Sequence, residues 1–253
     1  MNAPVQLPLP VELIAIGIGA MYGTLSAVKE RLAISGVVAL AVVLGLGGGL
    51  IRDTLIQRGT PVAFTTPSYL LTAVTVGVIA VLLAGSLVRM RFLLDGLDAL
   101  SFALFAVLGA DKALLAGIPV LGAMLIGELT GTGGSVLHDT LLGRPAELLR
   151  PGRLLGVAAA PGLLLYPVAA EAGGQRWTFF VIATAVITII RLGAVYPGWE
   201  VGPAATITER SDRIMRRSGA AAREALTRQR RRTSLARRDD GTVPEPPPAD
   251  PVG

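Results

Sequence analysis

Long apolar segments separated by short charged loops occupy the chain up to about residue 199. A helix that crosses a bilayer needs about 20 mostly apolar residues. Two segments, residues 68–88 and 177–196, are apolar almost throughout, whereas others carry charges within their apolar runs. We predict seven membrane-spanning helices, at residues 11–28, 32–53, 68–88, 92–115, 117–142, 154–170 and 177–196.

An internal repeat supports this assignment. Residues 12–56 recur without a gap at residues 98–142, so that Gly23 corresponds to Gly109 and Asp53 to Asp139. Fixed spacing over this length indicates a duplicated structural unit. The spans that carry charges are therefore supported as well, because each copy predicts the structure of the other.

Three predicted spans fall in each copy, and this odd number makes the two copies cross the membrane in opposite directions. The predicted fold class is an all-α polytopic membrane protein, with seven helices arranged as an inverted 3+3 repeat plus one. The predicted parts are an N-terminal extension (1–10), a first repeat (11–88), a second repeat (92–171), a last span (176–196) and a tail (200–253).

A glycine cluster lies inside one predicted span of each copy, GLGGGLIRD at residues 45–53 and GTGGSVLHD at residues 131–139. Each glycine in a helix costs about 1 kcal/mol relative to alanine. We expect both helices to be kinked and interrupted there, with freed backbone groups lining a transport pathway. The alternative is that the glycines only let two helices pack closely. The cluster residues are Gly47, Gly48, Gly49, Gly131, Gly133, Gly134 and Ser135.

Ionisable residues flank both clusters. Arg52 and Asp53 follow the first cluster, His138 and Asp139 follow the second, and Glu128 precedes the second. Charges inside membrane spans cost about 2.5–3.5 kcal/mol each and usually face a bundle interior or water. We therefore predict that these residues line the pathway. For Arg52 and Asp53 the alternative is an ion pair near the headgroups, and for His138 a hydrogen-bonded histidine at a helix end.

Composition excludes several classes of function. Hydrophobic residues make up 52% of the chain and charged residues 16%, which is unlike a soluble domain. The net charge of +5 comes largely from an arginine-rich tail, so no nucleic-acid partner is expected. The absence of cysteine excludes thiol chemistry, and the single histidine has no metal-ligand partner. No enzyme motif is present, and we expect no catalytic residues, metal or cofactor.

The positions of lysine and arginine predict the orientation, because cytoplasmic loops are enriched in them. A cytoplasmic C-terminus and an external N-terminus place most basic loops inside a bacterial cell membrane. Trp177 and Trp199 bracket the last span, as interfacial anchors do. The basic first part of the tail is either an amphipathic helix on the anionic leaflet or a solvated disordered segment. Its proline-rich end is expected to be unstructured.

These motifs resemble those of the prokaryotic branch of the trimeric intracellular cation (TRIC) channel family, whose duplicated unit is also called a glycine-transporter domain. The resemblance rests on GLGGGLIRDTLI, LDALSFALFAVLGADKAL and GTGGSVLHDTLLGRP, and it covers about residues 11–196. It implies a homotrimer with one potassium-conducting pore per protomer, beside the second and fifth helices. In this sequence Ser135, His138 and Glu128 depart from the family pattern. The residues that match the motifs are Gly47, Gly48, Gly49, Arg52, Asp53, Gly133, Gly134 and Asp139.

We therefore expect a monovalent cation channel that is surrounded by membrane lipids. An alternative is a transporter of glycine or another small zwitterion, whose carboxylate would bind at half-helix N-termini. A third possibility is a membrane adaptor that acts through the basic tail.

Overall fold

The computed structural model describes residues 7–146, 152–153, 159–195 and 200–201. Its first half contains α1 (Leu9–Val28), α2 (Ile34–Ile56), the short α3 (Val62–Thr65) and α4 (Pro67–Leu87). The second half contains α5 (Arg91–Leu115), α6 (Val120–Leu141), α7 (Ala160–Glu171) and α8 (Arg176–Val195). Two-residue strands β1 (Gly152–Arg153) and β2 (Glu200–Val201) pair antiparallel. The predicted helical membrane fold is confirmed, whereas α3 and the small strand pair were not predicted.

Six helices in the described part of the chain are long and apolar enough to cross a membrane: α1, α2, α4, α5, α6 and α8. The predicted span at residues 154–170 corresponds to α7, whose 12 residues include Pro167. Residues 154–158 lie outside the described residues, as does the tail after Val201. The count of seven spans and the structure of the tail therefore stay predictions.

Proline and glycine mark the helix boundaries. Pro67 is the first residue of α4, and Pro119 precedes α6, where a missing backbone N–H leaves no helical bond unmade. Gly117 and Gly143 follow α5 and α6 with positive φ angles of 81° and 69°. Such a backbone conformation strongly favours glycine. Apart from the predicted span at 154–170, whose first residues are not described, the predicted and observed spans begin and end within a few residues of each other.

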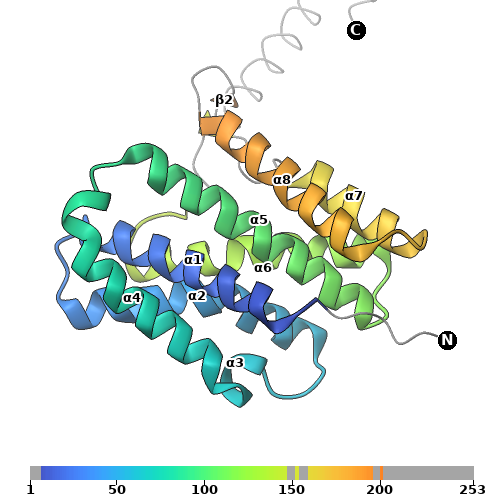
Figure 1. The fold of residues 1–253 in the computed structure, drawn as a ribbon, viewed down its shortest axis with the longest axis horizontal. Helices are drawn as coiled ribbons and strands as arrows, with labels where there is room; N and C mark the ends of the chain where they lie inside the picture. Colours follow the sequence, from blue (N-terminus) through green and yellow to red (C-terminus); the bar gives the residue numbers. More distant parts are fainter. Residues whose placement is uncertain (1–6, 147–151, 154–158, 196–199, 202–253) are drawn as a thin grey trace, which may run out of the picture. The chain divides into compact units, whose positions relative to one another are not determined.

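The two halves of the bundle are assembled in the same way (Figure 1). In the first half α4 packs against α1 and α2, and in the second half α7 packs against α5 and α6. The halves meet where α1 contacts α5 and where α2 contacts α6. The additional helix α8 packs on α5 and α7. This is the arrangement expected for a 3+3 repeat with one further helix.

Reciprocal contacts between α2 and α6 reveal an internal two-fold relation. A Cβ atom added at Gly134 would lie 2.6 Å from the carbonyl oxygen of Leu44, and one added at Gly48 would collide with the carbonyl oxygen of Thr130. Gly48 and Gly134 are repeat counterparts, and so are Leu44 and Thr130. A contact in which i meets j and j meets i is the mark of a two-fold axis. The glycine clusters therefore form the contact between the two copies.

The expected interruption of these two helices is wrong. Both α2 and α6 are continuous α-helices through Gly47–Gly49 and Gly131–Gly134. Close packing of the two backbones explains Gly48 and Gly134, because a side chain at either position would force the helices apart. The structure instead agrees with the alternative interpretation, in which the glycines let α2 and α6 pack closely together. A continuous helix can still bend, so the predicted kinks stay a prediction.

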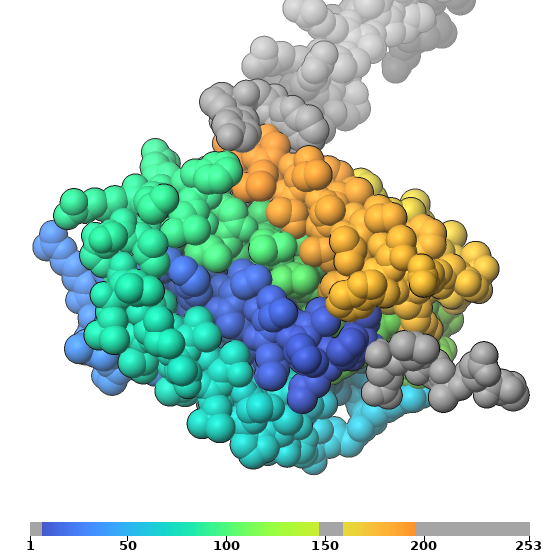
Figure 2. All heavy atoms as spheres, in the orientation of Figure 1, coloured from blue at the N-terminus to red at the C-terminus, as the bar shows by residue number. Residues whose placement is uncertain are grey.

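Large apolar side chains cover the outside of the bundle. On α4, Leu71 and Leu82 are mostly exposed, and on α8 Ile189 is as well. Figure 2 shows the face that includes these two helices. A helix with an apolar outer surface is suited to contact with lipid rather than water. Inside, the largest core cluster combines small residues of α1 and α5 with Phe102 and Phe105 of α5 and with larger side chains of α7 and α8, such as Tyr166 and Phe180.

The C-terminal helices are fastened to α5 by a buried carboxylate. Asp111 is 1% exposed, and it accepts hydrogen bonds from the Tyr166 hydroxyl at 2.5 Å and from Arg176 Nη1 at 2.8 Å. We predict that Tyr166→Phe lowers the free energy of unfolding by about 1–3 kcal/mol, since it leaves a buried acceptor less satisfied. Thermal unfolding in detergent measures the effect. Thr178→Ala, which removes an exposed hydrogen bond to Gln175, serves as the control, and equal effects of both changes would contradict the prediction.

Candidate functional site

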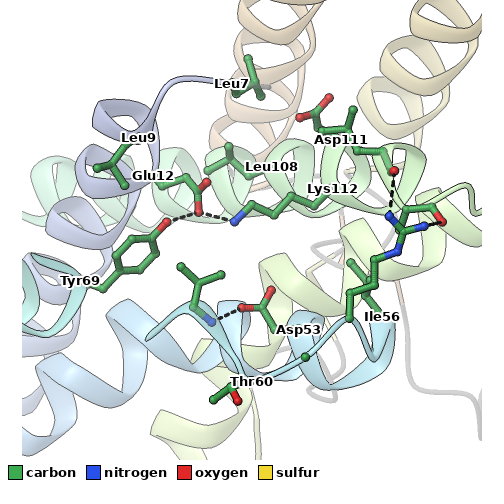
Figure 3. A pocket seen from close by; sticks show the side chains of 15 residues that line it. Leu7, Leu9, Glu12, Asp53, Ile56, Thr60, Tyr69, Leu108, Asp111 and Lys112 are labelled. Carbon is green, nitrogen blue, oxygen red and sulfur yellow. Dashed lines mark hydrogen bonds and ion pairs between the residues drawn. The ribbon is translucent and has the colours of Figure 1, made fainter. Parts of the chain in front are cut away.

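A large polar hollow lies at one end of the bundle, between α1, α2, α4 and α5. Its volume is about 450 Å³, and its walls carry both charged and apolar side chains. Glu12 lines it and joins three helices: Glu12 Oε2 accepts hydrogen bonds from Tyr69 Oη at 2.7 Å and from Lys112 Nζ at 2.6 Å. Figure 3 shows these side chains from α1, α4 and α5 pointing toward one another. We call this hollow the first vestibule.

Asp53 closes the side of the first vestibule formed by α2. Its Oδ1 accepts a hydrogen bond from Arg52 Nε at 2.7 Å, and Arg52 Nη2 lies 2.7 Å from the same oxygen in an ion pair. Its Oδ2 accepts the backbone N–H of Val62 at 2.9 Å, which fixes the start of α3 (Figure 3). Arg58 donates to the carbonyl oxygens of Leu115 and Ala116 at the end of α5. Charges of both signs thus surround the vestibule in fixed positions.

Two much smaller hollows lead inward from the vestibule. The second hollow, of about 20 Å³, shares Glu12, Asp53 and Tyr69 with the first vestibule and reaches Gly45 and Gly49. The third, of about 10 Å³, is bordered by Asp98, Phe102, Thr130, Gly131, Gly134 and Ser135, together with Tyr22, Leu44, Ser101 and Phe105. Each holds about one water molecule at most. Phe105 is the residue that the linings of the two small hollows share.

A second vestibule lies at the opposite ends of α1 and α5. It has a volume of about 200 Å³ and shares Tyr22 with the third hollow. Asp139 accepts a hydrogen bond from Arg144 Nε at 2.9 Å, and Arg144 Nη1 also contacts Glu30 at 3.0 Å. Lys29 and Asp95 complete its charged lining. Four hollows linked by shared residues therefore follow the interface between the two repeat copies from one end to the other.

His138 lies just behind the second vestibule. It is buried, its Nε2 is 3.0 Å from Ser26 Oγ, and its Nδ1 is 3.6 Å from Asp139 Oδ1. Ser26 donates its own hydroxyl proton to the carbonyl of Gly23 at 3.0 Å. The ring thus ties α6 to α1. It occupies the position that Arg52 holds in the other copy, beside the equivalent aspartate.

The structure brings most predicted pathway residues to the repeat interface. Gly49, Arg52, Asp53, Gly131, Gly134, Ser135 and Asp139 line one of the four hollows. Gly47, Gly48 and Gly133 lie in the crossing of α2 and α6 instead. Glu128 is not among the residues that line these hollows. Its Oε1 is buried and has no hydrogen-bond partner among the described residues.

Several lining residues were not among the predicted pathway residues, namely Glu12, Tyr69, Phe105, Asp111 and Lys112. One signal for them was present: Asp111 and Lys112 interrupt an otherwise apolar run. Such charges face a bundle interior more often than lipid. Phe105 has no distinguishing sequence feature, because phenylalanine is ordinary in a buried span.

The arrangement is suited to the passage or binding of a small polar solute or ion. Carboxylates occur in both vestibules and beside the third hollow. In the described part of the chain, no group of three or more His, Asp or Glu side chains is placed to hold a metal ion. Continuous helices leave few carbonyl oxygens free beside the hollows, so side chains provide most of the polar contacts.

Sequence comparisons identify related membrane proteins. A family model described as Glycine transporter matches the chain twice, over residues 9–85 and 96–171. A UPF0126 membrane protein of Deinococcus radiodurans is 33% identical over 180 residues, which cover 68% of this chain and 84% of that protein. The UPF0126 inner membrane protein YadS of Escherichia coli is 31% identical over 55% of this chain and 68% of its own length.

Solved structures show the same fold. The TRIC trimeric intracellular cation channel orthologue from Rhodobacter sphaeroides superposes with a TM-score of 0.68 and 30% identity, covering 73% of this chain and 95% of that one. A prokaryotic TRIC channel solved in 0.5 M KCl has the same TM-score at 24% identity, over 74% of this chain and 94% of that one. The chain therefore belongs to the membrane-protein family described as Glycine transporter, alongside its UPF0126 relatives, and it has the fold of the prokaryotic TRIC channels.

Proposed function

We propose that the protein is a channel for monovalent cations, chiefly potassium, in the inner membrane of a bacterium. Each protomer contains one pathway, formed by the four linked hollows, and three protomers assemble as a homotrimer. The solved relatives described as TRIC cation channels support this proposal. The observation that carries it is the line of hollows along the repeat interface, with charged side chains in both vestibules, since transport pathways in duplicated membrane proteins lie at such interfaces.

Cation preference in this proposal comes from acidic side chains rather than from unwound backbone. Glu12 and Asp53 border the path at one end, Asp98 in the middle and Asp139 at the other end. Rings or series of carboxylates favour cations in channel pores. Basic residues form ion pairs with these carboxylates, hold them in place and lower the net negative charge around the path. We therefore expect moderate selectivity for cations over anions.

The narrow centre indicates a closed state. A hydrophobic constriction blocks ions because water does not fill it stably, and Phe105 lines both of two small spaces with room for about one water molecule each. In this proposal its ring is the barrier between them. Conduction then requires Phe105 to move or the helices around it to separate. With the N-terminus outside, the first vestibule faces the exterior and the second faces the cytoplasm.

Flux measurements in proteoliposomes test the proposal. The purified protein is reconstituted, a voltage is imposed, and uptake of potassium is compared with uptake of labelled glycine. We expect potassium flux that is driven by voltage and rises with concentration without saturating. Saturable counterflow of glycine, with no voltage-driven potassium flux, would refute the channel proposal.

Transport of a small zwitterion is the second candidate. The first vestibule supports it, because a hollow of about 450 Å³ lined by Lys112, Arg58, Asp53 and Asp111 offers partners to both a carboxylate and an ammonium group. Each of these charged groups already has a partner within the protein: Glu12 for Lys112, a backbone carbonyl for Arg58, Arg52 for Asp53 and Arg176 for Asp111. This leaves less capacity for a ligand. For this reason we place the carrier second to the channel.

Phe105→Ala is predicted to increase the single-channel conductance or the open probability severalfold. The shorter side chain joins the second and third hollows, which removes the hydrophobic barrier. Single-channel recording in planar bilayers measures this, and it does not depend on the amount of folded protein. Phe92→Ala on the same helix, where the ring is largely exposed, is the matched control. Unchanged currents from both variants would show that Phe105 is not the barrier.

A further inference from the structure

Two repeat-related carboxylates occupy opposite halves of the pathway. Glu12 is near the start of α1 and Asp98 near the start of α5, and they correspond to each other in the repeat. Each is paired with a cation: Lys112 Nζ lies 2.6 Å from Glu12, and Arg191 Nη2 lies 2.8 Å from Asp98. Both carboxylates border a hollow. The local charge beside each of these hollows therefore depends in part on how completely this carboxylate is neutralised.

The two neutralising cations have different origins. Lys112 belongs to α5, inside the duplicated unit, and its counterpart in the first copy is Ser26. Arg191 belongs to α8, which lies outside both copies, so it has no repeat counterpart. The duplicated scaffold alone leaves Asp98 without this partner. The helix added after the repeats thus sets the charge of the third hollow.

Arg191 is buried and held on two sides. It is 6% exposed, and its Cζ lies 3.9 Å above the centre of the Phe102 ring in a cation–π contact. Phe102 and Asp98 both line the third hollow. A guanidinium that bonds a carboxylate and stacks on an aromatic face has little freedom to move away. Asp98 is therefore masked persistently in this state.

Glu128 on α6 is also influenced by the charge of Arg191, but it is not among the residues that line the four hollows. Asp98 is therefore the carboxylate through which Arg191 acts on the pathway. Removal of Arg191 leaves this carboxylate without its cation beside the third hollow, where interactions between charges are weakly screened.

We propose that Arg191 is a specificity-determining residue: by masking Asp98 beside the third hollow, it sets the ratio of potassium to chloride permeability. This inference rests on the proposed channel function. Arg191 acts from outside the repeat and does not need to touch the ion. Its effect is electrostatic and is carried by Asp98.

Reversal potentials in a KCl gradient across a planar bilayer test the inference. For Arg191→Gln we expect the permeability ratio of potassium to chloride to rise by about threefold to tenfold, because an unmasked unit charge near the path outweighs thermal energy at the dielectric constant of a protein interior. For Asp98→Asn we expect the ratio to fall, since Arg191 is then unbalanced. Arg191→Lys and the double variant Asp98→Asn/Arg191→Gln are expected to stay close to the unmodified protein.

The reversal potential separates this role from a structural one, because it does not change with the number of folded channels. If Arg191→Gln lowers stability yet leaves the reversal potential unchanged, the inference is wrong. Should that variant fail to fold, Asp98→Asn decides alone, and an unchanged ratio overturns the inference. The unmodified protein tests the proposed function separately: absence of any cation-selective current refutes the channel itself.

Discussion

Replacing Gly48 by leucine is expected to abolish ion flux and to weaken the bundle, while insertion into the membrane is retained. An added Cβ at Gly48 collides with the carbonyl oxygen of Thr130 on the facing helix. Since the clash is with backbone rather than with a flexible side chain, α2 and α6 must separate. Overpacking of this kind costs about 1–3 kcal/mol in ordinary cores and more where the surroundings cannot yield. Gly134→Leu, at the counterpart position, is expected to have the same effect.

Substitution of a glycine outside the contact shows whether the effect at Gly48 comes from its contact with α6 or from replacing any helical glycine. Gly85 on α4 has nothing within 4 Å of an added Cβ, so Gly85→Ala should stabilise the helix slightly or leave it unchanged. Gly48→Ala should give an intermediate loss. Thermal unfolding in detergent and potassium flux in proteoliposomes measure the series. Normal transport by both leucine variants would show that the crossing of α2 and α6 does not control the pathway.

The helical membrane fold could be predicted because its two signals are local. Long apolar runs define the spans. Spans that carry charges, such as residues 92–115, are assigned because the corresponding segment of the other repeat copy is also a span. The pseudo-two-fold relation also follows from the odd number of spans per copy. The short α3 was missed because four residues, Val62–Thr65, make too weak a pattern.

The role of the glycine clusters could not be decided from the sequence. A break in a helix and a close approach of two helices both favour the absence of a Cβ atom, so the same residues are compatible with either. What distinguishes them is the position of Thr130 opposite Gly48 and of Leu44 opposite Gly134. That pairing depends on how the two copies dock, and no spacing within one copy encodes it.

The sequence indicated only some of the residues that line the hollows, because the others are recognised only through contacts between distant helices. Arg52 and Asp53 stand out as adjacent charges in an apolar run, whereas the partners of Glu12 and Asp98 are 100 and 93 residues away along the chain. Both partners, Lys112 and Arg191, were visible as charges but not as members of a pair. Contacts between distant helices require the packing of the whole bundle.

Arg52→Gln is expected to lower the free energy of unfolding by about 3–5 kcal/mol, because breaking a buried ion pair leaves an uncompensated charge. Arg52 is 3% exposed, and both its Nε and Nη2 contact Asp53 Oδ1 at 2.7 Å. Asp53 in turn holds the start of α3 through Val62. The substitution should therefore also disturb the wall of the first vestibule and reduce ion flux. Thermal unfolding and proteoliposome flux measure the two consequences.

An exposed ion pair in the same protein provides the comparison. Arg144 and Glu30 approach to 3.0 Å with side chains that are 33% and 45% exposed, so Glu30→Gln should cost at most about 1 kcal/mol. Arg144 occupies the repeat position of Arg58 rather than of Arg52, and water reaches its pair. If Arg52→Gln and Glu30→Gln lower stability equally, then burial does not strengthen the first pair. The Arg52–Asp53 contact would in that case behave as the headgroup-level ion pair that the sequence alone allowed, in which water reaches both charges.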